Sequence, residues 1–131
     1  MADGTNVESA LPATRRESLE ALASSVRKSE AALAGMRRRG ANTTLVRRRL
    51  RALTVGLAAL ERAWQGVPYP YTPADLAEAR DILAGLLPSI ERICARSGEG
   101  SRQRTLLERR IAAMRLAIRA LDEASAPKGA R

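Results

Sequence analysis

The 131-residue chain is 45% hydrophobic but only 2% aromatic, with no Phe, so its core must be built mostly from Leu, Ile, Val and Ala. This composition favours closely packed helices over a sheet, and the length suits a single domain. The chain carries 23 basic and 14 acidic residues, a net charge of +9, and no His. The absence of His removes the commonest general base and the commonest metal ligand, which argues against an enzyme.

Several other protein classes are also disfavoured. Residues 1–14 hold acidic and small polar residues where a secretory signal needs a basic start and an apolar run. The longest clearly apolar run without a charge, residues 52–60, is far shorter than the roughly 20 residues of a membrane span. Cys94 is the only cysteine, and its helical apolar position predicts a buried, unreactive thiol. We therefore expect a cytoplasmic protein with no membrane segment, no metal and no cofactor.

The first predicted helix follows a flexible arm, residues 1–13. Thr14 and Glu17 are spaced as a capping box, in which each side chain satisfies the other's backbone N–H, so the helix is expected to begin there. Gly40 ends it. Ser29 is the only polar residue in its seam. The seam recurs at alternating steps of three and four: Leu19, Leu22, Val26, Ser29, Leu33 and Met36.

The second helix has the cleanest periodicity in the chain. Asn42 or one of the two threonines after it is expected to cap its start, and Gly66 and Pro68 end it. Residues 67–73 then form a linker that the prolines stiffen. The seam of this helix is Val46, Leu50, Leu53, Leu57, Leu60 and Trp64.

The third helix is predicted to begin with a second capping box. Thr72 is its cap, Pro73 occupies the first helical position, and Asp75 stands where the reciprocal acceptor belongs. Pro88 lies inside the helix with Gly85 nearby, which predicts a kink; a full break is disfavoured because the apolar spacing continues. The seam is Leu76, Ala79, Leu83, Leu86, Ile90 and Ile93.

The fourth helix is expected to follow Gly98 and Gly100, with Ser101 as its cap. Its seam is Leu107, Ile111, Met114, Ile118 and Leu121. The last residues, 125–131, are predicted to form a flexible tail.

Four helices with short connections predict an all-α fold, an antiparallel four-helix bundle over residues 14–124. Its two αα-hairpins, 14–66 and 72–124, are expected to be similar. Residues 44–63 align without a gap on residues 105–124 with eight of twenty positions identical, including the Thr, the Arg pair and the Ala-Leu step. A duplication explains this alignment. Two helices rich in Ala, Leu and Arg also resemble each other by composition, and the sequence leaves both explanations open.

Arginines surround both predicted hairpin tips. The first tip has Arg37, Arg38, Arg39, Arg47, Arg48, Arg49 and Arg51. The second has Arg92, Arg96, Arg102, Arg104, Arg109 and Arg110. In an up-down-up-down bundle both tips lie at the same end, so we expect these thirteen arginines to converge.

Arginines in the first turns of the second and fourth helices oppose the helix dipole, so local helix stability does not explain them. A site for phosphate or carboxylate does, because Arg offers paired donors in one plane. The alternative is a solvated face that keeps the protein soluble. The candidate anion- or partner-binding residues are Arg37, Arg38, Arg39, Arg47, Arg48, Arg49, Arg51, Arg102, Arg104, Arg109 and Arg110.

The three aromatic residues lie within eight positions of one another, around the Pro-rich linker. Trp and Tyr dominate binding interfaces, so Trp64, Tyr69 and Tyr71 are candidate interface residues. Alternatively, Trp64 closes the core and the tyrosines cover its end.

These patterns favour a non-enzymatic helical interaction or adaptor protein whose arginine-rich end contacts an acidic partner, either another protein or a further copy in a homo-oligomer. The alternative is an accessory protein that binds nucleic acid or another polyanion through phosphates, without reading bases.

Overall fold

A computed structural model describes residue 7 and residues 10–125, and these residues form four helices and no strand. The helices are α1 (Pro12–Arg38), α2 (Thr44–Gln65), α3 (Pro73–Arg96) and α4 (Arg102–Ser125). The predicted all-α class with four helices is confirmed. Most of the predicted arm and nearly all of the predicted tail lie outside the described residues.

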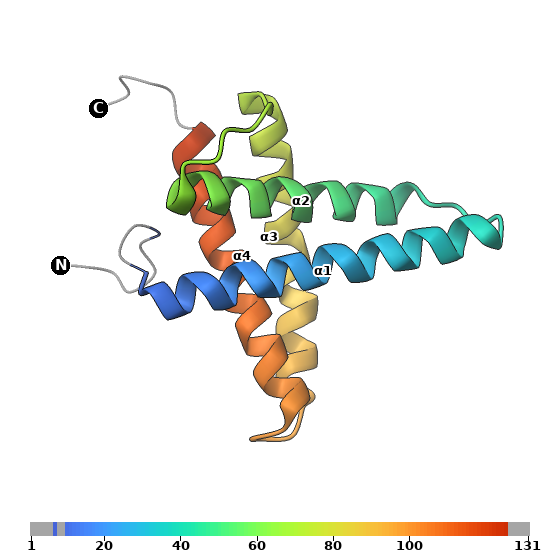
Figure 1. The fold of residues 1–131 in the computed structure, drawn as a ribbon. Coiled ribbons are helices and arrows are strands. Elements are labelled where there is room, and N and C mark those ends of the chain that lie inside the picture. Colours follow the sequence, from blue (N-terminus) through green and yellow to red (C-terminus); the bar gives the residue numbers. More distant parts are fainter. Residues whose placement is uncertain (1–6, 8–9, 126–131) are drawn as a thin grey trace.

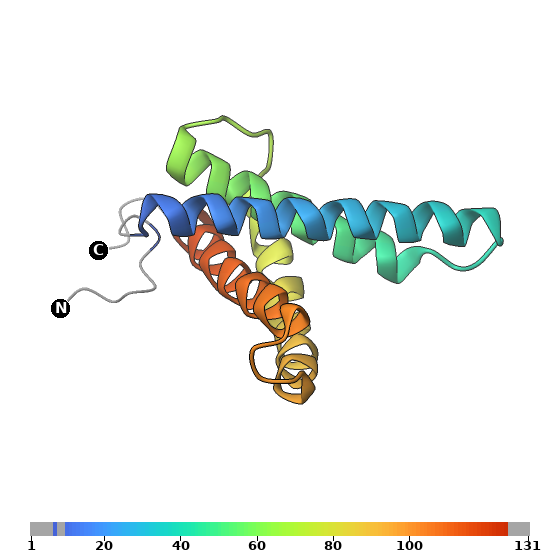
Figure 2. The same cartoon turned by 60° about the horizontal axis from the view of Figure 1, so that its bottom comes forward.

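The four helices form a cross rather than one aligned bundle. α1 and α2 lie side by side, α3 and α4 lie side by side, and the two pairs cross steeply (Figure 1). α1 packs on α2 and α4, and α3 packs on the same two helices, but α1 and α3 have no contact within the described chain. The loop after α1 and the loop after α3 point in different directions in both views (Figures 1 and 2).

The expectation that both tips lie at one end of the molecule is therefore wrong. Apolar periodicity identifies the face of a helix that is buried, but it does not fix the angle at which two helices cross. The crossing angle depends on which side-chain ridges of one helix fit the grooves of the other, and the side chains at the contact set how closely the helices approach.

Gly56 marks the point where α2 crosses α3 and α4. A Cβ atom added to Gly56 would lie 2.9 Å from Leu83 Cδ1 and 3.4 Å from Ala117 Cβ. Ala52, Ala59 and Ala113 are buried as well. Small residues on α2 and α4 thus allow the two helices to approach closely.

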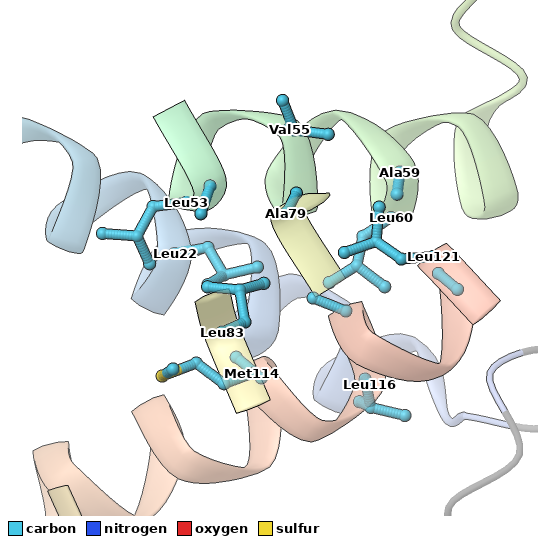
Figure 3. Packing of buried hydrophobic residues seen from close by; sticks show 14 of the residues in the cluster. Leu22, Leu53, Val55, Ala59, Leu60, Ala79, Leu83, Met114, Leu116 and Leu121 are labelled. Atoms are coloured by element: carbon cyan, nitrogen blue, oxygen red, sulfur yellow. The ribbon is translucent and has the colours of Figure 1, made fainter. Parts of the chain in front are cut away.

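The main core surrounds this crossing and receives side chains from all four helices (Figure 3). Leu22 of α1, Leu60 of α2, Leu83 of α3, and Met114 and Leu121 of α4 are fully buried. A smaller cluster, Cys94, Leu107 and Ile111, holds the far ends of α3 and α4 together. The prediction that Cys94 is buried is confirmed.

The helix starts differ from prediction in α1. This helix begins at Pro12, with Leu11 as its cap residue and no side-chain cap, so the capping box expected at Thr14 and Glu17 is wrong. The fixed φ of Pro suits the first turn of a helix, and the Arg15 N–H donates to the Leu11 carbonyl at 2.9 Å. Thr14 is therefore inside the helix.

At the start of α2, the capping hydrogen bond comes from the residue before the cap position. Thr43 occupies the cap position without a side-chain hydrogen bond. Instead, Asn42 Oδ1 accepts a hydrogen bond from the Thr44 N–H at 3.0 Å. Gly66 ends the helix at φ 70°, a left-handed conformation that favours Gly.

The predicted caps of α3 and α4 are confirmed. The Asp75 N–H donates to Thr72 Oγ1 at 3.1 Å, and the Thr72 N–H donates to Asp75 Oδ2 at 3.0 Å. Ser101 Oγ accepts from the Arg104 N–H at 3.1 Å. α3 continues through Pro88 without a break, and a kink at this position stays a prediction.

Candidate functional site

The cross shape separates the arginines into two groups. We call residues 37–51, which form the tip of the α1–α2 pair, the cationic arm. The arm extends away from the crossing and away from the tip of the α3–α4 pair (Figures 1 and 2). The predicted convergence of thirteen arginines is thus wrong, and each group has to be considered by itself.

The arginines of the cationic arm lie in three places: the end of α1, the connecting loop and the start of α2. Arg37 and Arg38 lie in the last turn of α1, where the helix dipole favours a positive charge. Gly40, at φ 68°, allows the chain to reverse. The first turns of α2 then present three consecutive arginines. All seven arginines of the arm are exposed: Arg37, Arg38, Arg39, Arg47, Arg48, Arg49 and Arg51.

The charge of the arm is not neutralised within the described part of the chain. The sequence has no acidic residue between Glu30 and Glu61. Arg51 is the one arm residue with an ion pair among the described residues, 3.4 Å from Asp75. Its guanidinium also lies 5.8 Å from the centre of the Tyr71 ring. The other six guanidinium groups face solvent.

Asp75 is itself perturbed by its position at the start of α3. The hydrogen bond from the Thr72 backbone N–H is the main cause that lowers the pKa of its carboxyl group below 3.8. Desolvation opposes this shift, and the Thr72 side chain and the charge of Arg51 add to it. Asp75 is therefore a structural cap that also holds Arg51 toward the base of the arm.

The arginines at the α3–α4 tip are, by contrast, partly used within the fold. Arg104 donates from Nη1 to the Ser97 carbonyl at 3.1 Å and from Nε to Glu108 at 3.4 Å. The Arg109 guanidinium lies 3.7 Å from the Glu17 carboxylate, which links α4 to α1. Arg102 is exposed. Only part of the second predicted group is available to an external anion.

The three aromatic residues pack against the main core and are half-buried. Trp64 donates from Nε1 to the Val7 carbonyl at 2.8 Å and stacks with Arg15, 5.6 Å from its ring centre. The Tyr69 and Tyr71 rings contact each other with centres 5.6 Å apart. Arg62 lies 4.8 Å from the Tyr69 ring. One face of each ring is thus already occupied within the chain.

Sequence reasoning missed a hollow where all four helices meet. Ser29 lies at its edge together with Lys28 and Arg110. Ser29 was the single polar residue in the apolar seam of the first helix, and this break was the signal that a bulky side chain is missing there. Leu45 was missed too: it is 56% exposed and lies on the cationic arm.

No group of three or more His, Cys, Asp or Glu side chains is placed to hold a metal ion among the described residues. No described helix contains an apolar stretch long enough to cross a membrane.

Comparisons with known proteins give no match: no family model fits the chain, and neither a curated protein nor a solved structure shows significant similarity to it.

Proposed function

We propose that this protein is a non-enzymatic, cytoplasmic adaptor that binds an acidic partner through the cationic arm. The observation that carries the proposal is the unneutralised charge of the arm. Seven arginines lie in a stretch without any acidic residue, and six of them have no ion pair among the described residues.

The position of these arginines supports binding over a purely solubilising role. Three of them stand in the first two turns of α2, at the end of the helix where the dipole disfavours positive charge. A surface that serves solubility alone mixes charges of both signs, whereas the arm has one sign only. Exposed Leu45 adds an apolar contact beside the guanidinium groups, as protein interfaces need at their centre.

Binding of nucleic acid or another polyanion is the alternative that the same arm supports. Arginine forks recognise phosphate as well as carboxylate. Tyr71 lies beside Arg51 at the base of the arm, and residues 37–51 themselves include no aromatic ring on which a base can stack. Such binding would follow the phosphate backbone and would not depend on base sequence.

The test uses a photo-crosslinking amino acid in place of exposed Ala41, at the tip of the arm. Cross-linking in the native cell should capture a partner with a strongly acidic surface, and nuclease treatment should leave the captured partner in place. The arm variant, Arg47, Arg48 and Arg49 all changed to Gln, should lose this partner.

The matched control removes the same charge from the other tip, by changing Arg92, Arg96 and Arg102 to Gln. This control should keep the partner. Equal loss in both variants would show that only net charge matters, and would refute the arm as a site. Capture that nuclease abolishes would refute the acidic protein and favour the alternative.

The alternative makes its own quantitative prediction. Each phosphate contact on duplex DNA contributes about 0.9 to the slope of log affinity against log salt, so the arm variant should lower that slope by roughly 2.7. The control variant should leave the slope nearly unchanged. No binding to duplex or single-stranded nucleic acid at low salt would refute this alternative.

A further inference from the structure

The hollow at the crossing of the helices is separate from the cationic arm and has a different chemistry. It is open to solvent and has a volume of about 210 Å³. Its walls come from all four helices: Ser25, Ser29, Leu53, Leu86, Ile90 and Met114.

The hollow is lined by two serines of α1, and one of them, Ser29, stands in the apolar seam where a larger side chain would fill the space. Ser25 is buried and donates to the Ala21 carbonyl at 3.0 Å, so its own hydrogen-bonding need is met within the helix. Ser29 is half-buried, and its hydroxyl makes no hydrogen bond to any described residue. A Leu at position 29 would continue the seam. The Ser leaves both a space and an unused polar group beside it.

Two cationic side chains stand at the edge of this apolar space. Lys28 and Arg110 line the hollow and also line the adjoining groove between α1 and α4, which has a volume of about 410 Å³. Neither residue makes an ion pair with a described residue. The acids of the adjoining groove, Glu17 and Glu20, do not line the hollow.

We propose that the hollow binds a small amphiphilic anion. Its apolar body would lie on Leu53, Leu86 and Ile90, and its carboxylate would lie between Lys28 and Arg110. Apolar walls with a few convergent polar groups are typical of sites for small ligands. Arg and Lys give charge-assisted hydrogen bonds to a carboxylate, and the Ser29 hydroxyl is placed to donate a further one.

Octanoate, which has an alkyl chain and one carboxylate, is the probe. Octanoate should bind saturably in calorimetry, and the NMR signal of the Met114 methyl group should shift in step. Two matched compounds separate the contributions: 1-octanol has the chain without the charge, and acetate has the charge without the chain. Each should bind at least about tenfold more weakly than octanoate, because each lacks one half of the recognition.

The protein variants separate the hollow from the rest of the surface. Ser29→Leu should fill the hollow and abolish binding, whereas Ala32→Leu, on the exposed side of the same helix, should leave it unchanged. Lys28→Gln combined with Arg110→Gln should weaken octanoate at least about tenfold and leave 1-octanol unaffected. The charge-matched control is Arg16→Gln combined with Arg92→Gln.

Three results would overturn the proposal. The first is the absence of saturable octanoate binding, and the second is 1-octanol binding as tightly as octanoate, which would leave only an apolar void. Equal weakening in the charge variant and its control would mean that octanoate responds to net charge. If Ser29→Leu does not fold by circular dichroism, the charge variants and the two matched compounds decide the outcome.

Discussion

Replacement of Gly56 by Ala tests whether α2 crosses α3 and α4 as closely as the structure shows. Gly in the middle of a helix is less favourable than Ala by about 1 kcal/mol, so a Gly→Ala change in an open helical position should stabilise the protein by that amount. At Gly56 the new Cβ would lie 2.9 Å from Leu83 Cδ1, well inside the 3.5–4.0 Å of a favourable carbon contact. Leu83 is fully buried, so its side chain has no solvent to rotate into.

The expected magnitude follows from these two effects. Overpacking of a core by one carbon costs about 1–3 kcal/mol. Against the gain of about 1 kcal/mol in helix propensity, Gly56→Ala should lower the free energy of unfolding by about 0–2 kcal/mol.

Gly85→Ala is the matched control, because Gly85 also lies inside a helix but has nothing within 4 Å of the position of a Cβ. This variant should gain about 1 kcal/mol. The propensity term is common to both variants and cancels, so their difference of about 1–3 kcal/mol measures the crowding at the crossing alone.

Urea denaturation followed by circular dichroism gives both free energies of unfolding, provided that the slope of each transition is unchanged. In a chain of this length, 1 kcal/mol corresponds to roughly 3–5 °C in Tm. Gly56→Ala as stable as Gly85→Ala would show that the helices do not approach at Gly56, and the crossed arrangement would have to be abandoned.

Two further predictions concern the helix caps. Thr72→Ala removes the capping box of α3 and should cost about 1 kcal/mol in thermal or urea unfolding, whereas Thr43→Ala, at a cap position without a side-chain hydrogen bond, should have a much smaller effect; equal effects would contradict the observed caps. The pKa of Asp75 is lowered in the folded protein, so its contribution to stability is fully present above 3.8 and is lost as the pH falls through the folded pKa. NMR titration should find the Asp75 pKa below 3.8, and closer to that value in Thr72→Ala, which removes the hydroxyl but keeps the backbone N–H of residue 72.

The sequence was sufficient to predict the four helices, because the signals for where a helix begins and ends are local. The Thr72 and Asp75 capping box, the Ser101 cap and the Gly66 stop each depend on a few neighbouring residues, and the structure has all three. The predicted start of α1 was wrong because two local signals, at Pro12 and at Thr14, lie two residues apart. The helix begins at Pro12 and not at the Thr14 pattern.

The arrangement of the helices was not predictable in the same way. The seam of α2 ran through its large residues, Leu53 and Leu60 among them. The structure also buries Ala52, Gly56 and Ala59, because α2 is covered by α3 and α4 as well as by α1. Small residues give a weak hydrophobic signal, yet they decide how closely two helices approach.

The candidate site was predictable in composition but not in position. The sequence identified the arginines of both tips, and it could not tell that Arg104 and Arg109 serve the fold while Arg47, Arg48 and Arg49 have no ion pair among the described residues. That difference depends on which acids lie nearby in space, and so on the crossing angle that the sequence did not reveal.

The crossed arrangement gives the protein a permanent electric moment. Charge of one sign is concentrated on an arm that extends from the centre of mass, and Glu61, Glu78, Asp81 and Asp122 lie outside that arm. In the field of an anionic surface, such a molecule experiences a torque that turns the arm forward before any contact is made. Because this field decays over about 8–10 Å at physiological salt, the orienting effect is confined to the last nanometre of approach and should fade as ionic strength rises.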